Sequence, residues 1–216
     1  MELPLFPLNT VLFPHATLPL HIFEERYKQM IGVCLEESRP FGVLAIRKGY
    51  EAGDGAEPFD IGTTARIAQV QHLDEGKMNV ICLGGDRFRM TSPVSNDPYL
   101  VGDVEVLATT DADDPKAKEL SDDAGALFAE YVRMYLAMSN QWARSIEMPS
   151  EADMLADFIG SRLTVDVATK QRLLEELSAR KRLAVEVQIL GEAIRQMGPR
   201  VEEARTVRWQ GFGVKN

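Results

Sequence analysis

Prolines punctuate the first 27 residues and limit what this segment can form. They stand at positions 4, 7, 14 and 19 and interrupt every apolar run of the segment. Because proline lacks an N–H and has a fixed φ, it is excluded from helix interiors and central strands. The pattern therefore predicts short extended pieces at residues 3–5 and 10–13, turned by the prolines and followed by a helix from about residue 24.

The same prolines argue against an export signal. A secretory signal needs a basic start followed by an unbroken apolar run, whereas the first charge here is Glu2. No apolar run approaches the roughly 20 residues of a membrane-spanning helix, so no membrane segment is expected. The two cysteines, Cys34 and Cys82, are far apart in the sequence. This spacing favours a reducing cytoplasm over a disulfide scaffold.

Residues 1–108 are predicted to form a β-domain. Apolar runs of strand length occur at 41–46, 61–70, 78–83, 87–90 and 100–107. Residues 49–60 are predicted as a surface loop, residues 74–77 as a hairpin turn, and Gly84-Gly85-Asp86 as a break between two strands. Short strands with frequent breaks favour a compact, mostly antiparallel barrel. The helix after residue 24 should pack one apolar stripe on the sheet.

The composition changes at residues 109–118, which are rich in Thr, Asp and Lys and are predicted to be a linker. Beyond them, apolar residues recur at helical spacing, which predicts an all-helical bundle over 119–200. Residues 201–216 are first charged and then aromatic and glycine-rich, and we expect a loose tail. The fold class expected from these patterns is α+β.

Charge and residue clusters exclude several functions. The chain carries 33 Asp and Glu against 24 Lys and Arg, a net charge of −9. Nucleic-acid binding needs a basic face, so nucleic acid is not expected as a partner. His15 and His21 lie near two glutamates, but their spacing is not one of helical metal ligands. We therefore predict no metal site and no cofactor.

Several motifs in fixed order carry a family resemblance. They are the LPLFPL opening at 3–8, the run FEERY at 23–27, IGTTARIAQV at 61–70, CLGGDRFR at 82–89 and ADFIGSRL at 156–163. Together they resemble the N-terminal domain of Lon proteases, in particular its free-standing members. The resemblance implies a PUA-like β-domain followed by a helical bundle, and a role in recognising protein substrates.

Catalytic motifs of the full protease are missing from this sequence. No Gly-x-x-x-x-Gly-Lys-Ser/Thr segment occurs, so no phosphate-binding loop is predicted. No serine stands in a Gly-x-Ser-x-Gly nucleophile turn. The two isolated cysteines also exclude the cysteine-bound zinc of a eukaryotic relative. The sequence therefore predicts a protein that is not an enzyme.

The predicted function is that of a non-catalytic binding module. Its partners would be unfolded or peptide-like protein segments, with a protease or a chaperone as a further partner in protein quality control. The candidate contacts are aromatic and cationic residues, namely Phe13, Phe23, Arg26, Arg66 and Arg87. The alternative for these positions is that two of the phenylalanines Phe6, Phe13 and Phe23 are core residues and that the arginines have structural roles or form ion pairs. The alternative is a small-molecule-binding protein or hydrolase that uses a cleft between the β-domain and the helices. RNA binding by analogy of fold is disfavoured by the charge, and the oligomeric state stays open.

Overall fold

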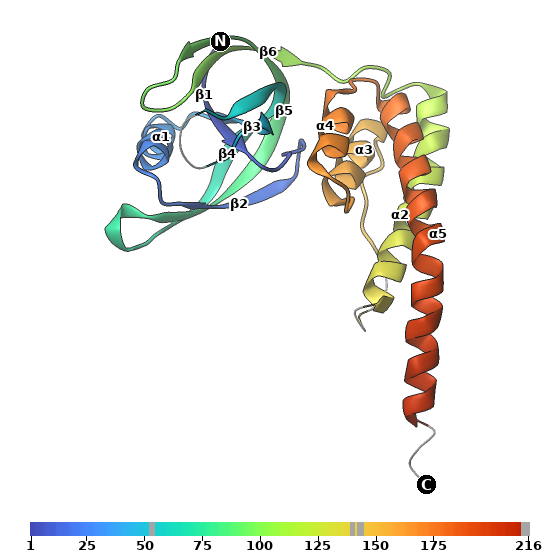
Figure 1. Cartoon of the computed structure of the whole chain (residues 1–216). Helices are drawn as coiled ribbons and strands as arrows, with labels where there is room; N and C mark the ends of the chain where they lie inside the picture. The colour runs from blue at the N-terminus through green and yellow to red at the C-terminus, as the bar shows by residue number, and fades with distance from the viewer. Residues whose placement is uncertain (52–54, 139–140, 142–144, 213–216) are drawn as a thin grey trace. The chain divides into compact units, whose positions relative to one another are not determined.

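The computed structural model describes the backbone of residues 1–51, 55–138, 141 and 145–212. The first part of the chain holds the strands β1 (Glu2–Leu8), β2 (Thr17–Ile22), β3 (Phe41–Lys48), β4 (Glu57–His72), β5 (Met78–Ser95) and β6 (Val101–Leu107). Helix α1 (Glu25–Glu36) follows β2, and the short turn η1 (Asp74–Gly76) joins β4 to β5. The helices α2 (Pro115–Met138), α3 (Ala152–Arg162), α4 (Val167–Glu175) and α5 (Ala179–Phe212) complete an α+β protein (Figure 1).

The chain divides into two compact units. The first contains Met1–Thr110 and Gly160–Leu177, and the second contains Asp111–Ile159 and Ser178–Asn216. The boundary near residue 110 falls within the expected linker. Residues 160–177, which we expected in the helical bundle, belong instead to the unit of the sheet. The physical reason is that Gln171 of α4 donates a hydrogen bond to the Ile61 carbonyl of β4, with an N–O distance of 2.9 Å.

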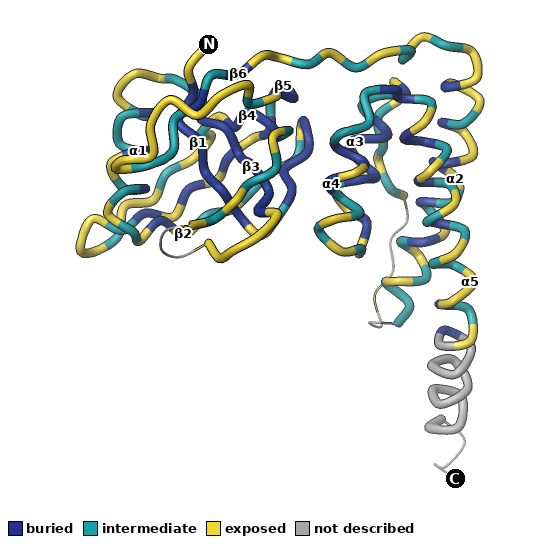
Figure 2. The backbone as a smooth tube through the Cα atoms, turned by 45° about the horizontal axis from the view of Figure 1, so that its top comes forward, coloured by how far each residue is buried: buried dark blue, intermediate teal, exposed yellow. Residues whose placement is uncertain are grey.

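The strands form one mixed sheet in the order β2-β5-β4-β3-β1-β6. The β1–β3 pair is parallel and the other pairs are antiparallel. Strand β5 also pairs with β6, so the pairings of β5, β4, β3, β1 and β6 close into a ring. Two apolar clusters fill the unit, one around Phe41, Met30 and Tyr27, where α1 packs on the sheet, and one around Leu5 and Phe88. Figure 2 shows β1 and β3 as largely buried strands.

The N-terminal segment is more regular than its prolines predict. Residues 3–5 belong to the longer strand β1, whereas residues 10–13 form no strand and residues 17–22 form β2. Pro19 is tolerated because β2 pairs only with β5 among the described strands. A proline in such an edge strand can direct its missing donor away from the sheet.

The glycine pair at 84–85 does not break the sheet, in contrast to our expectation. Strand β5 is continuous through it, with a register shift against β4 nearby. A Cβ on Gly84 would lie 2.2 Å from the Phe13 carbonyl oxygen. The Gly84 carbonyl accepts a hydrogen bond from the His15 amide, at 3.0 Å. Glycine is therefore needed here because the N-terminal loop crosses the strand at van der Waals contact.

The second unit is helical. Helices α2 and α5 pack side by side, and Figure 1 shows them running along one another. Phe128 of α2 packs edge-on against Phe158 of α3, with 5.7 Å between ring centroids. Helix α5 extends to Phe212 and contains Pro199, so residues 201–212 continue the helix where we expected a loose tail. Residues 213–216 of that tail lie outside the described residues.

Candidate functional site

A groove lies between β2 and the start of α1, and its floor is apolar. Strand β2 alternates, so that Leu18, Leu20 and Ile22 turn toward the core while Pro19 and His21 are exposed. The first part of the groove has a volume of about 290 Å³. Its apolar lining includes Phe6, Leu8, Leu18, Leu20, Ile22 and Phe23. Such a lining can contact a ligand through its apolar surface.

A second, larger pocket of about 490 Å³ adjoins the first at Tyr27 and Glu51, which line both. Its apolar lining includes Pro7, Met90, Pro93 and Leu100. Its charged lining comprises Arg26, Arg47, Glu51, Glu57 and Asp60. The two neighbouring pockets of the first unit, which share these two lining residues, are together called here the Tyr27 groove.

Tyr27 is fixed at the junction of the two pockets. Its ring stacks on Phe6 with 3.9 Å between centroids, and the Arg26 guanidinium lies 4.6 Å from the ring centre. Burial raises the pKa of the Tyr27 phenol, which Glu24 and Glu51 also raise and Arg26 opposes. The phenol therefore keeps its proton at neutral pH.

Arg26 bridges the rim of the groove. Its guanidinium pairs with the Glu24 carboxylate at 3.0 Å and donates to the Glu51 carbonyl oxygen at 3.3 Å. The Glu51 carboxylate in turn accepts a hydrogen bond from the Asn9 amide. Glu24 is the N-cap residue of α1 but makes no side-chain cap bond, because its carboxylate binds Arg26 instead. These contacts hold the loop around residue 51 against the start of α1.

The structure brings together two of the five residues suggested by the sequence. Phe23 is 54% exposed and lines the first pocket, where its ring stacks on His21. Arg26 lines the second pocket. The groove residues that sequence reasoning missed are Tyr27 and the apolar residues of β2. The alternation of Leu18 and Leu20 around Pro19 was the available signal.

The other three residues lie elsewhere. Phe13 is fully buried, because Thr63 binds the neighbouring Leu12 carbonyl at 2.6 Å and draws this loop onto the sheet. Phe13 is therefore a core residue and not a surface contact. Arg66 is exposed on β4, opposite Leu83 of β5, and does not line the Tyr27 groove.

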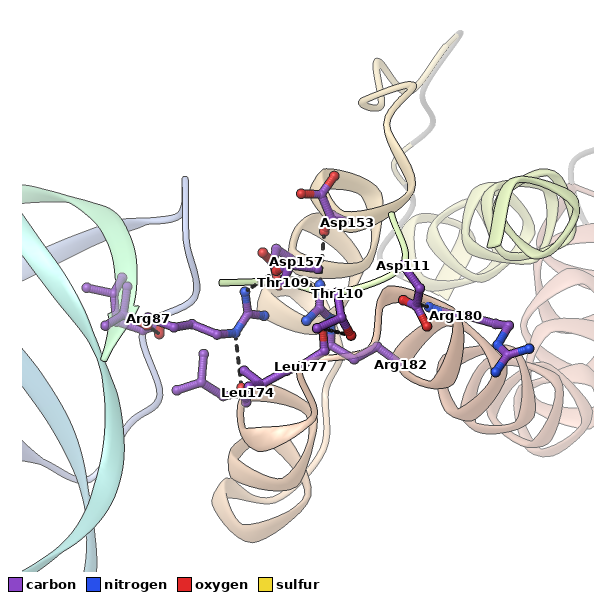
Figure 3. Close-up of polar contacts among 12 residues, drawn as sticks. Arg87, Thr109, Thr110, Asp111, Asp153, Asp157, Leu174, Leu177, Arg180 and Arg182 are labelled. Atoms are coloured by element: carbon purple, nitrogen blue, oxygen red, sulfur yellow. Dashed lines mark hydrogen bonds and ion pairs between the residues drawn. The ribbon is translucent and has the colours of Figure 1, made fainter. Parts of the chain in front are cut away.

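Arg87 has a structural position, which Figure 3 shows. Its side chain is only 3% exposed. Its Nε donates to the Leu174 carbonyl oxygen of α4 at 3.0 Å, and its Nη1 lies 3.5 Å from the Thr109 hydroxyl. Arg87 thus ties β5 to α4 within the first unit, in place of the contact with a ligand that we expected.

The part of the chain that the structure describes holds neither a candidate metal site nor a candidate membrane-spanning helix. Among the residues of this part, His, Cys, Asp and Glu side chains form no group of three or more that could hold a metal ion. The His21 ring is hydrogen-bonded to the Asn79 side chain at 2.8 Å. No helix within the described ranges has both the length and the apolarity needed to span a bilayer.

The mixed sheet followed by helices is an α+β fold that is also found in solved structures. The Lon N-terminal domain protein of Xanthomonas campestris has a similar structure, with a TM-score of 0.64 and 26% identity over 85% of this chain and 95% of that one. The chain belongs to the family described as the ATP-dependent protease La (LON) substrate-binding domain, whose model matches residues 2–192. The resemblance inferred from the sequence motifs is therefore confirmed.

Further relatives agree with this assignment. The N-terminal domain of the Mycobacterium avium complex Lon protease has the same fold, with a TM-score of 0.68 at 18% identity over 88% of this chain and 98% of that one. The Lon protease of Anaeromyxobacter dehalogenans is 26% identical over 94% of this chain. That of Syntrophomonas wolfei is 30% identical over 84%. The chain spans about a quarter of the length of these two proteases.

Proposed function

We propose that this chain binds extended, unfolded protein segments in the Tyr27 groove and makes no catalytic contribution of its own. The observation that carries the proposal is an apolar groove, open along an edge strand, in a member of a substrate-binding family. Extended segments suit such a groove because alternate side chains of a peptide can enter it while the backbone stays near solvent.

The shape of the groove favours a peptide over a small molecule. Pockets for small ligands usually enclose most of the ligand surface. Here two adjoining pockets share Tyr27 and Glu51 and have half-exposed walls such as Leu18 and Leu20. Two neighbouring open pockets suit successive residues of an extended chain better than one compact molecule.

We further propose a description of the sheet, a compartment and a cellular role for this chain. The closed ring of pairings from β5 through β6 supports a PUA-like barrel as the description of the sheet. The free, buried thiols Cys34 and Cys82 suit a reducing compartment such as the cytoplasm. We propose that the chain works in protein quality control, where it presents bound segments to a protease or a chaperone.

Binding can be tested with the exposed aromatic residue of the groove. Phe23→Ala should weaken the binding of a fluorescent, permanently unfolded peptide by about tenfold, because exposed aromatic anchors carry much of the energy of such contacts. Fluorescence anisotropy measures this affinity. Tyr135→Ala is the matched control, since Tyr135 is 50% exposed on α2 and lies outside the groove. Equal affinity of the Phe23→Ala variant and the unsubstituted chain would contradict the proposal.

A further inference from the structure

The lining of the Tyr27 groove has an excess of negative charge. Among the residues that the structure describes, the two pockets are lined by four carboxylates, Glu24, Glu51, Glu57 and Asp60, and by two guanidinium groups, Arg26 and Arg47. The difference is a net charge of −2, before any contribution of His21. Glu51, Glu57 and Asp60 are exposed, so their carboxylates face solvent and an incoming ligand.

One of the two cations is already neutralised within the groove. Arg26 pairs with Glu24 at 3.0 Å and also lies over the Tyr27 ring. This leaves Arg47 against three exposed carboxylates in the larger pocket. A cationic side chain placed there gains attraction from several carboxylates, whereas an acidic side chain meets repulsion.

The open edge of β2 cannot supply an uninterrupted row of backbone hydrogen bonds. The Gly84 amide donates to the Ala16 carbonyl at 2.9 Å. In an antiparallel pair only every second residue bonds to the neighbouring strand, so from Ala16 onward the residues of β2 alternately bond to β5 and face away from it. Leu18, Leu20 and Ile22 thus bond to β5, while Thr17, Pro19 and His21 turn their backbone groups outward. Because Pro19 has no N–H, the middle of the outward edge lacks a donor. Recognition in this groove must depend more on side chains than on strand addition.

We propose that the Tyr27 groove selects extended segments in which an apolar residue is followed closely by lysine or arginine. The apolar residue occupies the pocket of Phe6, Leu20 and Phe23, and the cation lies near Glu51, Glu57 and Asp60. The net charge of −9 on the whole chain adds a longer-range attraction for such segments. This inference rests on the proposed peptide-binding function and adds to it a chemical class of client.

The test uses three labelled peptides that share one apolar core and differ only in flanking residues, which are Lys, Gln or Glu. At about 20 mM salt, the Lys peptide should bind about tenfold more tightly than the Glu peptide, and this ratio should shrink several-fold at about 0.5 M salt because ions screen the groove. Fluorescence anisotropy on the full chain gives each affinity.

The charge preference is located with two triple variants of equal charge change. E51Q/E57Q/D60N removes the exposed carboxylates of the groove, and the Gln at 51 keeps an oxygen for the Asn9 amide. E119Q/E130Q/D122N makes the same change on exposed positions of α2, outside the groove. Only the groove variant should reduce the Lys-to-Glu ratio to about twofold. Circular dichroism verifies that both variants are folded.

The possible failures are distinguishable. If the three peptides bind equally and Phe23→Ala still weakens all of them, the charge selection is wrong while the peptide-binding function stands. If both triple variants lose the preference to the same degree, net charge and not the groove is responsible, and the inference fails. If no peptide binds to the unsubstituted chain, the proposed function itself fails.

Discussion

Arg87 shows how far a single residue can depart from the expectation set by its sequence context. In an acidic protein, a cationic residue on a strand next to the exposed Arg89 looks like a surface contact. Its guanidinium instead lies in the interior, where it donates to the Leu174 carbonyl at 3.0 Å. Arg89, two residues on, remains 47% exposed in its side chain and pairs with Glu105 at 2.9 Å. Burial, and not residue type, separates their roles.

Substitution of these two arginines should have unequal effects on stability. Arg87→Met should lower the free energy of unfolding by about 2–3 kcal/mol, because it removes a charged donor and leaves a buried carbonyl unpaired. Arg89→Met, the control, should cost about 0–1 kcal/mol because its ion pair is exposed. Amide hydrogen exchange along β5 measures both changes. Equal protection in the two variants would argue against the structural role of Arg87.

At the scale of elements, helix α4 depends on a local cap and on contacts that are distant in sequence. Asp166 is its N-cap residue, and its carboxylate accepts from the Thr169 amide at 2.8 Å. Leu174 and Gln171, both buried, connect the same helix to the sheet of the first unit. The periodic apolar residues predicted helices in this part of the chain. The location of α4 beside the sheet was not predicted.

The N-cap of α4 predicts a pH dependence. Hydrogen bonds from the Thr169 amide and hydroxyl hold the pKa of Asp166 below its usual value of 3.8. A lowered pKa stabilises the folded state above the unfolded pKa, and this contribution is lost as pH falls through the folded pKa. Exchange of the Thr169 amide should therefore be faster, relative to the intrinsic rate, at pH 3 than at pH 6.

The variant Asp166→Ala provides the control for that measurement. It should lack the pH-dependent change at Thr169 and show faster exchange already at pH 6, since the cap is absent at both values. Asp166→Asn should retain much of the protection at pH 6, because an Asn side chain can cap a helix without titrating. A pH response that persists in Asp166→Ala would show that another group is responsible.

At the scale of the whole molecule, the two units have cores of different character. The first unit has an apolar core around Phe41 and Phe88, beside which the buried Arg87 donates to a backbone carbonyl. The second unit contains buried charge on α3 and α5, where Arg182 is fully buried and lies 3.7 Å from the Asp157 carboxylate (Figure 3). Its guanidinium also lies 3.5 Å from the Asp153 carbonyl oxygen. Glu186, one turn further along α5, is also fully buried.

Breaking this buried pair should destabilise the second unit strongly. Arg182→Leu should lower the free energy of unfolding by about 3–5 kcal/mol, because Asp157 then loses a buried partner. The triple variant R182L/D157L/E186L should recover most of that loss, since it removes the buried charges together. Arg180→Leu is the control, because its pair with Asp114 is partly exposed, at 40% and 29% of the two side chains. Urea unfolding followed by circular dichroism at 222 nm measures these effects, and an Arg182→Leu value near that of Arg180→Leu would refute the argument.

The sequence by itself determined the family, the α+β class and most of the strand and helix segments. These follow from local properties such as apolar periodicity, proline positions and motif order, which a single chain displays directly. It also pointed to Phe23 and Arg26, because both belong to the same short N-terminal motif that leads into α1.

Only the tertiary structure decided which residues share a surface. It buried Phe13 in a loop that crosses Gly84, turned Arg87 toward α4 and placed Glu51 beside Tyr27. It also attached residues 160–177 to the unit of the sheet. The physical reason is that burial and charge pairing depend on contacts between segments far apart in the chain, as in the hydrogen bond from Arg87 to Leu174, and no local pattern encodes them.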